Sequence, residues 1–222
     1  MEIVFNKLSY IENKNSSLER KFFDSVSFKI SEGSVIGFVT YDLRILNSLL
    51  TVVKRPTKGE IIIGDMSIKR TTHIDNINSL RKYIGYVSYR DNVFFKSTVK
   101  EEIQFTMDNF SYEVKNLDRH LSSSMKMVLL DDTYLDRDPN SLSFTEKKKV
   151  MLGVVLSYNP NVIILDDFFD GFTYKEKVYF KKLFIKLKSN FKKTIIVLDS
   201  NVSNMFDFVD NFYVMHKWSI IL

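Results

Sequence analysis

Residues 159–167 read NPNVIILDD, an apolar run that ends in two carboxylates. A short apolar run between polar turn residues is typical of a buried β-strand. The segment SLSFTEKKKV at residues 141–150 precedes it, and a serine followed three residues later by a glutamate is typical of a helix N-terminus. We therefore expect a helix over 143–157 that leads into a strand over 162–166, with Asp166 and Asp167 at its carboxyl end.

Helices and strands are expected to alternate after this strand. The pattern predicts a helix over 174–190, a strand over 194–199, a short helix over 202–208 and a strand over 211–215. Strands that alternate with helices form a parallel sheet, and the acids at the strand end indicate a nucleotide-hydrolase fold. The helix over 174–190 is predicted to bury Tyr174, Val178, Leu183, Phe184, Leu187 and Phe191.

The N-terminal half combines strands with a helical block. Strand patterns fit MEIVF, FDSVSFKI, SVIGFV and EIIIGD. A short apolar helix is expected over 46–54, and residues 98–130 have helical periodicity throughout. We expect a single α/β domain over residues 1–222, with a β-rich N-terminus and a helical lobe at about 98–158.

Composition limits the classes of protein to which this chain can belong. Its 222 residues are 45% hydrophobic, and the absence of cysteine excludes disulfides and suits a reducing compartment, so we expect one cytoplasmic unit. We find neither an export signal nor an apolar run near the roughly 18 residues that span a bilayer. The net charge of +5 is mild, and the lysines within 147–149 and 181–193 are expected on solvated helix faces, so no nucleic-acid partner is expected.

Six segments, taken in order, resemble one family. They are EGSVIGFV, RPTKGEIIIGD, LRKYIGYVSY, TVKEEIQF, YLDRDPNSLSFTEKKKVMLGVVLSYNPNVIILDD and KKTIIVLDSN. In these segments the chain resembles the ATP-binding subunits of ABC transporters, and it is most similar to the ATPase subunits of energy-coupling-factor (ECF) uptake systems. The resemblance implies a P-loop-NTPase-like parallel core sheet with an antiparallel N-terminal β subdomain. It also implies a place on the cytoplasmic face of the membrane, where a membrane subunit docks a coupling helix against the helical lobe and the groove near Tyr89.

The phosphate-binding loop of that family is altered here. In the pattern G-x-x-x-x-G-K-[ST], backbone N–H groups surround the phosphates and a lysine neutralises them. The two glycines, the lysine and the Mg²⁺-binding hydroxyl are replaced by Thr40, Ile45, Leu46 and Asn47. Arg44 is either a substitute phosphate ligand or an exposed arginine. We expect a vestigial nucleotide loop, which comprises Thr40, Arg44, Ile45, Leu46, Asn47 and Ser48.

The acids after the apolar run occupy catalytic positions of the family. The resemblance places Asp166 where an aspartate holds Mg²⁺ through water, and Asp167 where a glutamate orients the attacking water. Aspartate is one methylene shorter than glutamate, and a misplacement of ~1 Å can cost about a hundredfold in rate. Tyr89 replaces the glutamine near the metal, and Ser200 replaces the switch histidine. We expect all four residues to be vestigial; the acids then merely end a buried strand.

The family signature LSGGQ reads LSFTE at residues 142–146. In the family its serine and the helix N-terminus bind the terminal phosphate of an ATP that the opposite subunit holds. Ser143 is kept, but Phe144 and Thr145 fill the space of the glycines, and Glu146 brings a negative charge toward phosphate. We expect Ser143 and Glu146 to form a capping box instead.

Other family positions are altered too. The aromatic residue that stacks on adenine aligns best with Glu12, although Tyr10 is close by. Phe168 and Thr173 replace a proline and an aspartate in the loop that faces the dimer partner. The histidines are expected on the surface or in loops, with no metal cluster: His73, His120 and His216.

The expected function is that of a pseudo-ATPase without a cofactor. It would be a structural or regulatory subunit of a membrane transport complex, beside a membrane subunit and an intact ATP-binding subunit. One alternative is a working ATPase that binds ATP and Mg²⁺ through Arg44, Asp166 and Asp167. Another is a soluble regulator that binds nucleic acid or protein through its basic faces. ATP binding separates the first two hypotheses, and membrane co-purification separates the first from the third.

Overall fold

The structure is a computed structural model that describes residues 1–39, 44–88, 94–216 and 219–221, with side chains through Val214. The strands are β1 (Ile3–Glu12), β2 (Arg20–Ile30), β3 (Val35–Val39), β4 (Lys58–Ile63), β5 (Met66–Ile68), β6 (Ile84–Ser88), β7 (Val162–Asp166), β8 (Thr194–Asp199), β9 (Asn211–His216) and β10 (Ser219–Ile221). The helices are α1 (Arg44–Leu50), α2 (Ile74–Arg81), α3 (Val99–Asn109), α4 (Leu117–Met127), α5 (Phe144–Ser157) and α6 (Tyr174–Phe191). Short 3₁₀ turns are η1 (Asp132–Tyr134), η2 (Pro139–Ser141) and η3 (Val202–Asn204).

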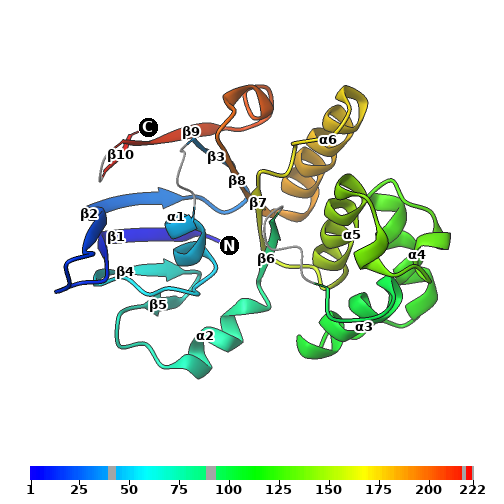
Figure 1. Cartoon of the computed structure of the whole chain (residues 1–222), viewed down its shortest axis with the longest axis horizontal. Helices are drawn as coiled ribbons and strands as arrows, with labels where there is room; N and C mark the ends of the chain where they lie inside the picture. The colour runs from blue at the N-terminus through cyan, green and yellow to red at the C-terminus, as the bar shows by residue number, and fades with distance from the viewer. Residues whose placement is uncertain (40–43, 89–93, 217–218, 222) are drawn as a thin grey trace.

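These elements form two sheets with helices around them (Figure 1). One sheet is antiparallel and has the order β2-β1-β4-β5. The other has the order β10-β9-β3-β8-β7-β6, and all its described pairs are parallel except that of β10 with β9. The predicted α/β fold, with a parallel core sheet and an antiparallel N-terminal sheet, is confirmed.

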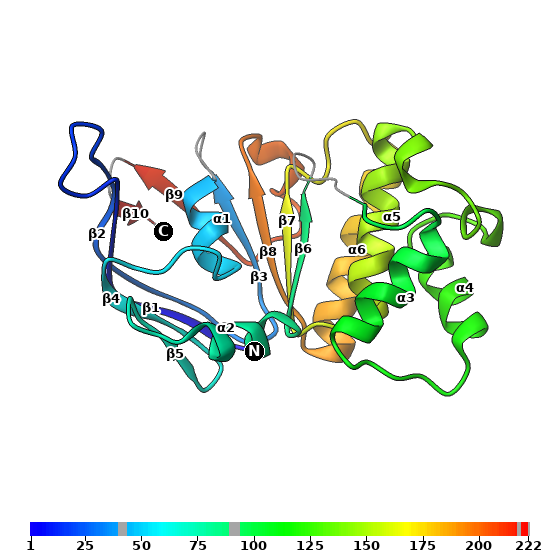
Figure 2. The same cartoon turned by 60° about the horizontal axis from the view of Figure 1, so that its bottom comes forward.

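The parallel sheet separates two hydrophobic cores. Because side chains alternate along a strand, Ile163 and Leu165 of β7 pack with α5 and α6, whereas Val162 and Ile164 pack with α1 and the antiparallel sheet. Figure 2 shows α1 between the two sheets, with α5 and α6 on the other side of the central strands. Asp166 continues the alternation of Ile164, so β7 directs its carboxylate toward α1.

The helical lobe contains a break that the sequence pattern did not predict. The block 98–130 is largely helical, as expected, but it consists of two helices, because α3 ends at Asn109 and α4 begins at Leu117. Between them Ser111 has a left-handed φ of 52°, which few residues adopt within a helix. The side chain of Asn116 then caps α4 by accepting a hydrogen bond from the Arg119 N–H.

Two predicted helices are shorter than expected. The helix over 46–54 ends at Leu50, and Val52 follows with a left-handed φ of 55°. The helix over 202–208 is reduced to the 3₁₀ turn η3. None of the described helices is both long and apolar enough to span a membrane.

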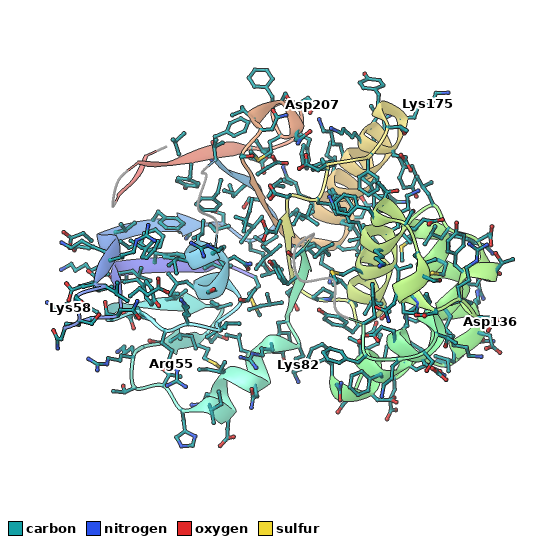
Figure 3. The ribbon with its side chains drawn as sticks, viewed as in Figure 1. Arg55, Lys58, Lys82, Asp136, Lys175 and Asp207 are labelled. Carbon is teal, nitrogen blue, oxygen red and sulfur yellow. The ribbon has the colours of Figure 1, made fainter. Side chains whose placement is uncertain are left out.

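The buried face of α6 was predicted correctly only in its middle. Tyr174 and Phe191, at its two ends, are 82% and 60% exposed and do not belong to the core. Phe180 is fully buried instead, with its ring 5.1 Å from that of Phe168. Lys175, in the first turn of the same helix, points to solvent (Figure 3).

Candidate nucleotide site

The candidate residues of the nucleotide loop lie at the start of α1. In parallel α/β sheets, ligands bind at the carboxyl ends of the strands, and α1 follows β3 at that edge. Arg44 is exposed, whereas Ile45 and Leu46 are 4% and 0% exposed and belong to the core around α1. The Ser48 hydroxyl donates to the Arg44 carbonyl at 2.7 Å. Thr40 lies outside the described residues.

Three side chains from different elements form a hydrogen-bonded group at this edge. The Tyr86 hydroxyl donates to Asp166 Oδ2 at 2.8 Å. The Asn47 amide donates to the Tyr86 hydroxyl, and its Nδ2 lies 3.4 Å from the same Asp166 oxygen. The structure thus brings together Asn47 and Asp166, the positions that the resemblance links to Mg²⁺. It adds Tyr86, which the sequence analysis missed; we call these three residues the Asn47–Tyr86–Asp166 group.

The loop after β7 is held by a buried lysine. Lys148 of α5 is 0% exposed, and its ammonium donates to the carbonyl oxygens of Asp167, Phe168 and Asp170 at 2.6, 3.1 and 2.9 Å. Burial lowers the pKa of Lys148 to about 8. The expectation that residues 147–149 form a solvated face was therefore wrong for Lys148, because the three carbonyls come from a segment about twenty residues away. It was also wrong for Lys149, which is 9% exposed and pairs with Glu176 of α6. Lysine is otherwise almost never fully buried without partners.

Asp167 has an unusual backbone conformation. Its φ is 47°, its N–H donates to the Leu198 carbonyl at 2.9 Å, and the residue is 8% exposed. Its carbonyl is the nearest acceptor of Lys148. The backbone of Asp167 is therefore held on both sides, by β8 and by α5.

Phe168 and Thr173, which replace the family's proline and aspartate, have structural contacts. Phe168 is fully buried against Phe169, Phe172, Phe180 and Phe184. Thr173 is the N-cap of α6 and forms a capping box with Glu176. Both residues thus stabilise this loop and the helix that follows it.

The signature segment begins α5 with the capping box that the sequence predicts. Glu146 Oε2 accepts hydrogen bonds from the Ser143 N–H at 2.9 Å and from the Ser143 hydroxyl at 2.5 Å. Its other oxygen accepts from the Tyr134 hydroxyl at 2.5 Å. The hydrogen bonds from Ser143 and Tyr134 lower the pKa of Glu146 to about 2. The hydroxyl of Ser143 is therefore engaged with a carboxylate.

Tyr10 and Glu12, the candidates for the position that stacks on adenine, both contact other residues of the chain. Tyr10 is 8% exposed and lies 6.3 Å from the Phe22 ring. The ammonium of Lys54 lies 5.5 Å from the centre of the Tyr10 ring and 2.5 Å from Glu12 Oε1. Tyr10 therefore already has a cation on its ring and a second ring beside it.

The remaining candidates are dispersed. Ser200 is exposed after β8, and Tyr89 lies outside the described residues. His73 is exposed, as expected. His120 contradicts the expectation of surface or loop histidines, because it is half-buried in α4 with Nε2 2.8 Å from the Ser157 carbonyl oxygen. Among the described residues, no group of three or more His, Cys, Asp or Glu side chains could hold a metal ion.

Comparison with known proteins identifies the family. The ABC transporter family model matches residues 44–170, more than half of the chain. The chain therefore belongs to the ABC transporter family.

It is 25% identical to the energy-coupling factor transporter ATP-binding protein EcfA2 of Enterococcus faecalis over 225 residues, which cover 100% of this chain and 78% of the relative. It is 31% identical to EcfA2 of Clostridioides difficile over 176 residues, which cover 75% of this chain and 59% of the relative. The resemblance to ECF ATP-binding subunits is confirmed.

Solved structures show the same fold. The dimeric bacterial ABC transporter cassette MJ0796 aligns with a TM-score of 0.89 at 17% identity and covers 99% of this chain and 97% of its own. The cbiO1 subunit of Clostridium perfringens, part of the ABC transporter complex cbiONQ, aligns with a TM-score of 0.82 at 23% identity and covers 99% and 86%. The architecture is therefore that of an ABC ATPase cassette.

Proposed function

We propose that this chain is a pseudo-ATPase, an ABC-type subunit that serves a membrane transport complex as a scaffold or regulator. The observation that carries the proposal is the Asn47–Tyr86–Asp166 group. It joins the position of the Mg²⁺-binding hydroxyl to that of the metal-binding aspartate through a tyrosine hydroxyl. Protein hydrogen bonds thus take the place of metal and nucleotide contacts.

The residues present do not fit a Mg²⁺ ion. Mg²⁺ requires oxygen ligands in octahedral geometry. Asp166 Oδ2 instead faces the Tyr86 hydroxyl and the Asn47 amide, and both are hydrogen donors directed at it. The Asn47 amide has its nitrogen toward the carboxylate, and its Oδ1 is buried without a hydrogen-bond partner among the described residues. A cation at Asp166 would meet the positive ends of these N–H and O–H groups.

The phosphate side of the site supports the same proposal. Leu46, at the position of the phosphate-binding lysine, is 0% exposed in the core around α1. A leucine side chain cannot neutralise phosphate, and each lost charge-assisted hydrogen bond removes roughly 1.5–3 kcal/mol. Loss of two such bonds weakens binding by about two to four decades. ATP would then bind at millimolar concentration or not at all.

The relatives support the proposed partners. Because the relatives are ECF transporter ATP-binding proteins, we place this chain on the cytoplasmic face of the membrane, beside a membrane subunit and an intact ATP-binding subunit. A pocket of about 430 Å³ lies between α1, β6 and the helical lobe, and Tyr86, Phe110 and Tyr158 line it. We assign this aromatic groove to the membrane subunit.

Thermal denaturation with Mg-ATP tests the pseudo-ATPase assignment. A ligand stabilises a protein by RT ln(1 + [L]/Kd), so about 1 mM Mg-ATP should leave the melting temperature unchanged within a degree. EcfA2 of Enterococcus faecalis, purified in the same way, is the positive control. A rise of several degrees in this chain would refute the proposal and favour an ATPase with an unconventional site.

A further inference from the structure

A second pocket lies at the opposite end of the parallel sheet. Its volume is about 290 Å³, near the lower end of the ~300–1,000 Å³ range of small-molecule sites. The wall is formed by the helical lobe and by the segments that enter β7 and β8. Its apolar part includes Leu156, Ile163, Leu187 and Phe191. Leu156 and Ile163 are buried in the core, whereas Phe191 is 60% exposed at the end of α6.

The pocket contains a buried cation. Lys193 is 8% exposed, and its ammonium donates to the Asn159 carbonyl at 3.0 Å. The expectation that the lysines within 181–193 lie on solvated helix faces was therefore wrong for Lys193, which follows the end of α6. Among the described residues, no carboxylate lies within ion-pair distance of it. An ammonium has three N–H donors, so two remain for a ligand. Burial lowers the pKa of Lys193, and a buried charge without a counter-ion is unfavourable unless an anion pairs with it.

His120 fixes the polar wall of the pocket. A carbonyl oxygen only accepts, so the hydrogen bond of 2.8 Å to Ser157 requires that Nε2 carries the hydrogen. The ring of Tyr112 also packs beside the His120 ring, with 6.2 Å between the two ring centres. His120 and Tyr112 thus form a fixed part of the wall of the pocket that contains Lys193.

We propose that this pocket binds a small amphiphilic carboxylate. The carboxylate pairs with the Lys193 ammonium, and a short aliphatic or aromatic body lies against Leu156, Ile163 and Leu187. A carboxylate can accept hydrogen bonds from the two remaining N–H groups of the ammonium, and an apolar body can pack against the apolar side chains of the pocket wall. The inference concerns a different end of the sheet and does not depend on the proposed function.

The test compares acids with their neutral amides on the full chain. Phenylacetate and hexanoate are titrated into the protein beside phenylacetamide and hexanamide, with affinity measured by calorimetry and position by methyl NMR. We expect the methyl signals of Leu156, Ile163 and Leu187 to shift, and each acid to bind at least tenfold more tightly than its amide. Equal affinities, or shifts confined to other methyl groups, would overturn the proposal. So would the absence of binding of both acids at ~10 mM, a concentration that detects even a weak Kd.

A charge-removing variant gives an independent check. Lys193→Met keeps the length of the side chain, and it should weaken acid binding at least tenfold, about 1.4 kcal/mol, without changing amide binding. Lys186→Met, at an exposed position of α6, is the matched control and should leave both unchanged. Circular dichroism establishes that each variant is folded. If the Lys193 variant is unfolded, the acid and amide titrations of the native chain still decide the outcome.

Discussion

Tyr86 provides the hydroxyl that satisfies a buried carboxylate. Asp166 is 7% exposed, and a buried carboxylate needs donors to offset the loss of water. In the parallel pair of β6 and β7, Tyr86 lies opposite Ile164, two residues before Asp166 on the same face. The long tyrosine side chain spans this offset and reaches Asp166 Oδ2. A tyrosine at this one position therefore makes Asp166 part of the protein's own hydrogen-bond network.

Tyr86→Phe should destabilise the fold. The variant keeps the ring but leaves Asp166 and the Asn47 amide short of a partner, so we expect the free energy of unfolding to fall by about 1–3 kcal/mol in urea denaturation. Tyr83→Phe, at a ring that is 38% exposed, is the control and should change it by less than about 0.5 kcal/mol. Equal stabilities of Tyr86→Phe and the native chain would contradict the importance of this hydroxyl.

Glu146 makes stability depend on acid pH. Its pKa falls from 4.5 to about 2 in the folded protein, so the folded state favours the ionised carboxylate. This contribution is fully present above pH 4.5 and is lost as pH falls toward 2. Because the group is partly exposed, solvent screening reduces the contribution to about 1 kcal/mol.

Glu146→Gln isolates that contribution. The variant should lower the free energy of unfolding by about 1 kcal/mol at neutral pH, and the difference should shrink toward zero near pH 2. Glu113→Gln, on an exposed glutamate, is the control and should change the free energy of unfolding at neutral pH by less than about 0.5 kcal/mol. A difference for Glu146→Gln that stays constant from pH 7 to about 2 would argue against the assigned hydrogen bonds.

At the scale of elements, the packing of α1 explains why returning one loop position to its family residue should not restore nucleotide binding. The helix has seven residues and is held by the burial of Ile45, Leu46, Leu49 and Leu50. Position 46 faces the core between the sheets rather than a phosphate. The geometry of α1 has therefore adapted to an apolar side chain at this position.

Leu46→Lys should destabilise the chain without creating a nucleotide site. An ammonium at a fully buried position has no carboxylate partner on its helix, so we expect a loss of about 3 kcal/mol or more and no thermal shift with Mg-ATP. Ser48→Lys, at a half-buried position two residues further along α1, should cost less than about 1 kcal/mol. A stable Leu46→Lys variant that binds Mg-ATP would show that the loop needs only its lysine.

The sequence predicted those elements whose signals are local. The helices that begin at Phe144 and Tyr174 have capping boxes, and β7 and β8 are short apolar runs, so their bounds were close to those observed. The break before Leu117 was not predictable from periodicity, because apolar residues continue across it. Lys148 and Tyr86 were missed for a different reason, since their partners lie on elements distant in the chain.

At the scale of the whole molecule, the proposed function implies that both halves of the family's composite site are altered on one chain. Family subunits pair head to tail, so each ATP contacts the phosphate loop of one subunit and the signature of the other. This chain has Leu46 on the loop side, and on the signature side it has Ser143 bonded to Glu146. If the proposed function holds, an intact partner gains neither a second nucleotide nor a normal signature from this chain.

ATP turnover of the reconstituted complex tests this account most directly. The chain is assembled with a membrane subunit and an intact ATP-binding subunit, and hydrolysis is measured with and without it. If the chain is a pseudo-ATPase, it adds little or no turnover, and Ser143→Ala and Asp167→Asn leave the rate unchanged. Robust hydrolysis that requires this chain and is lost in Ser143→Ala would show that its signature still works and would contradict the pseudo-ATPase assignment.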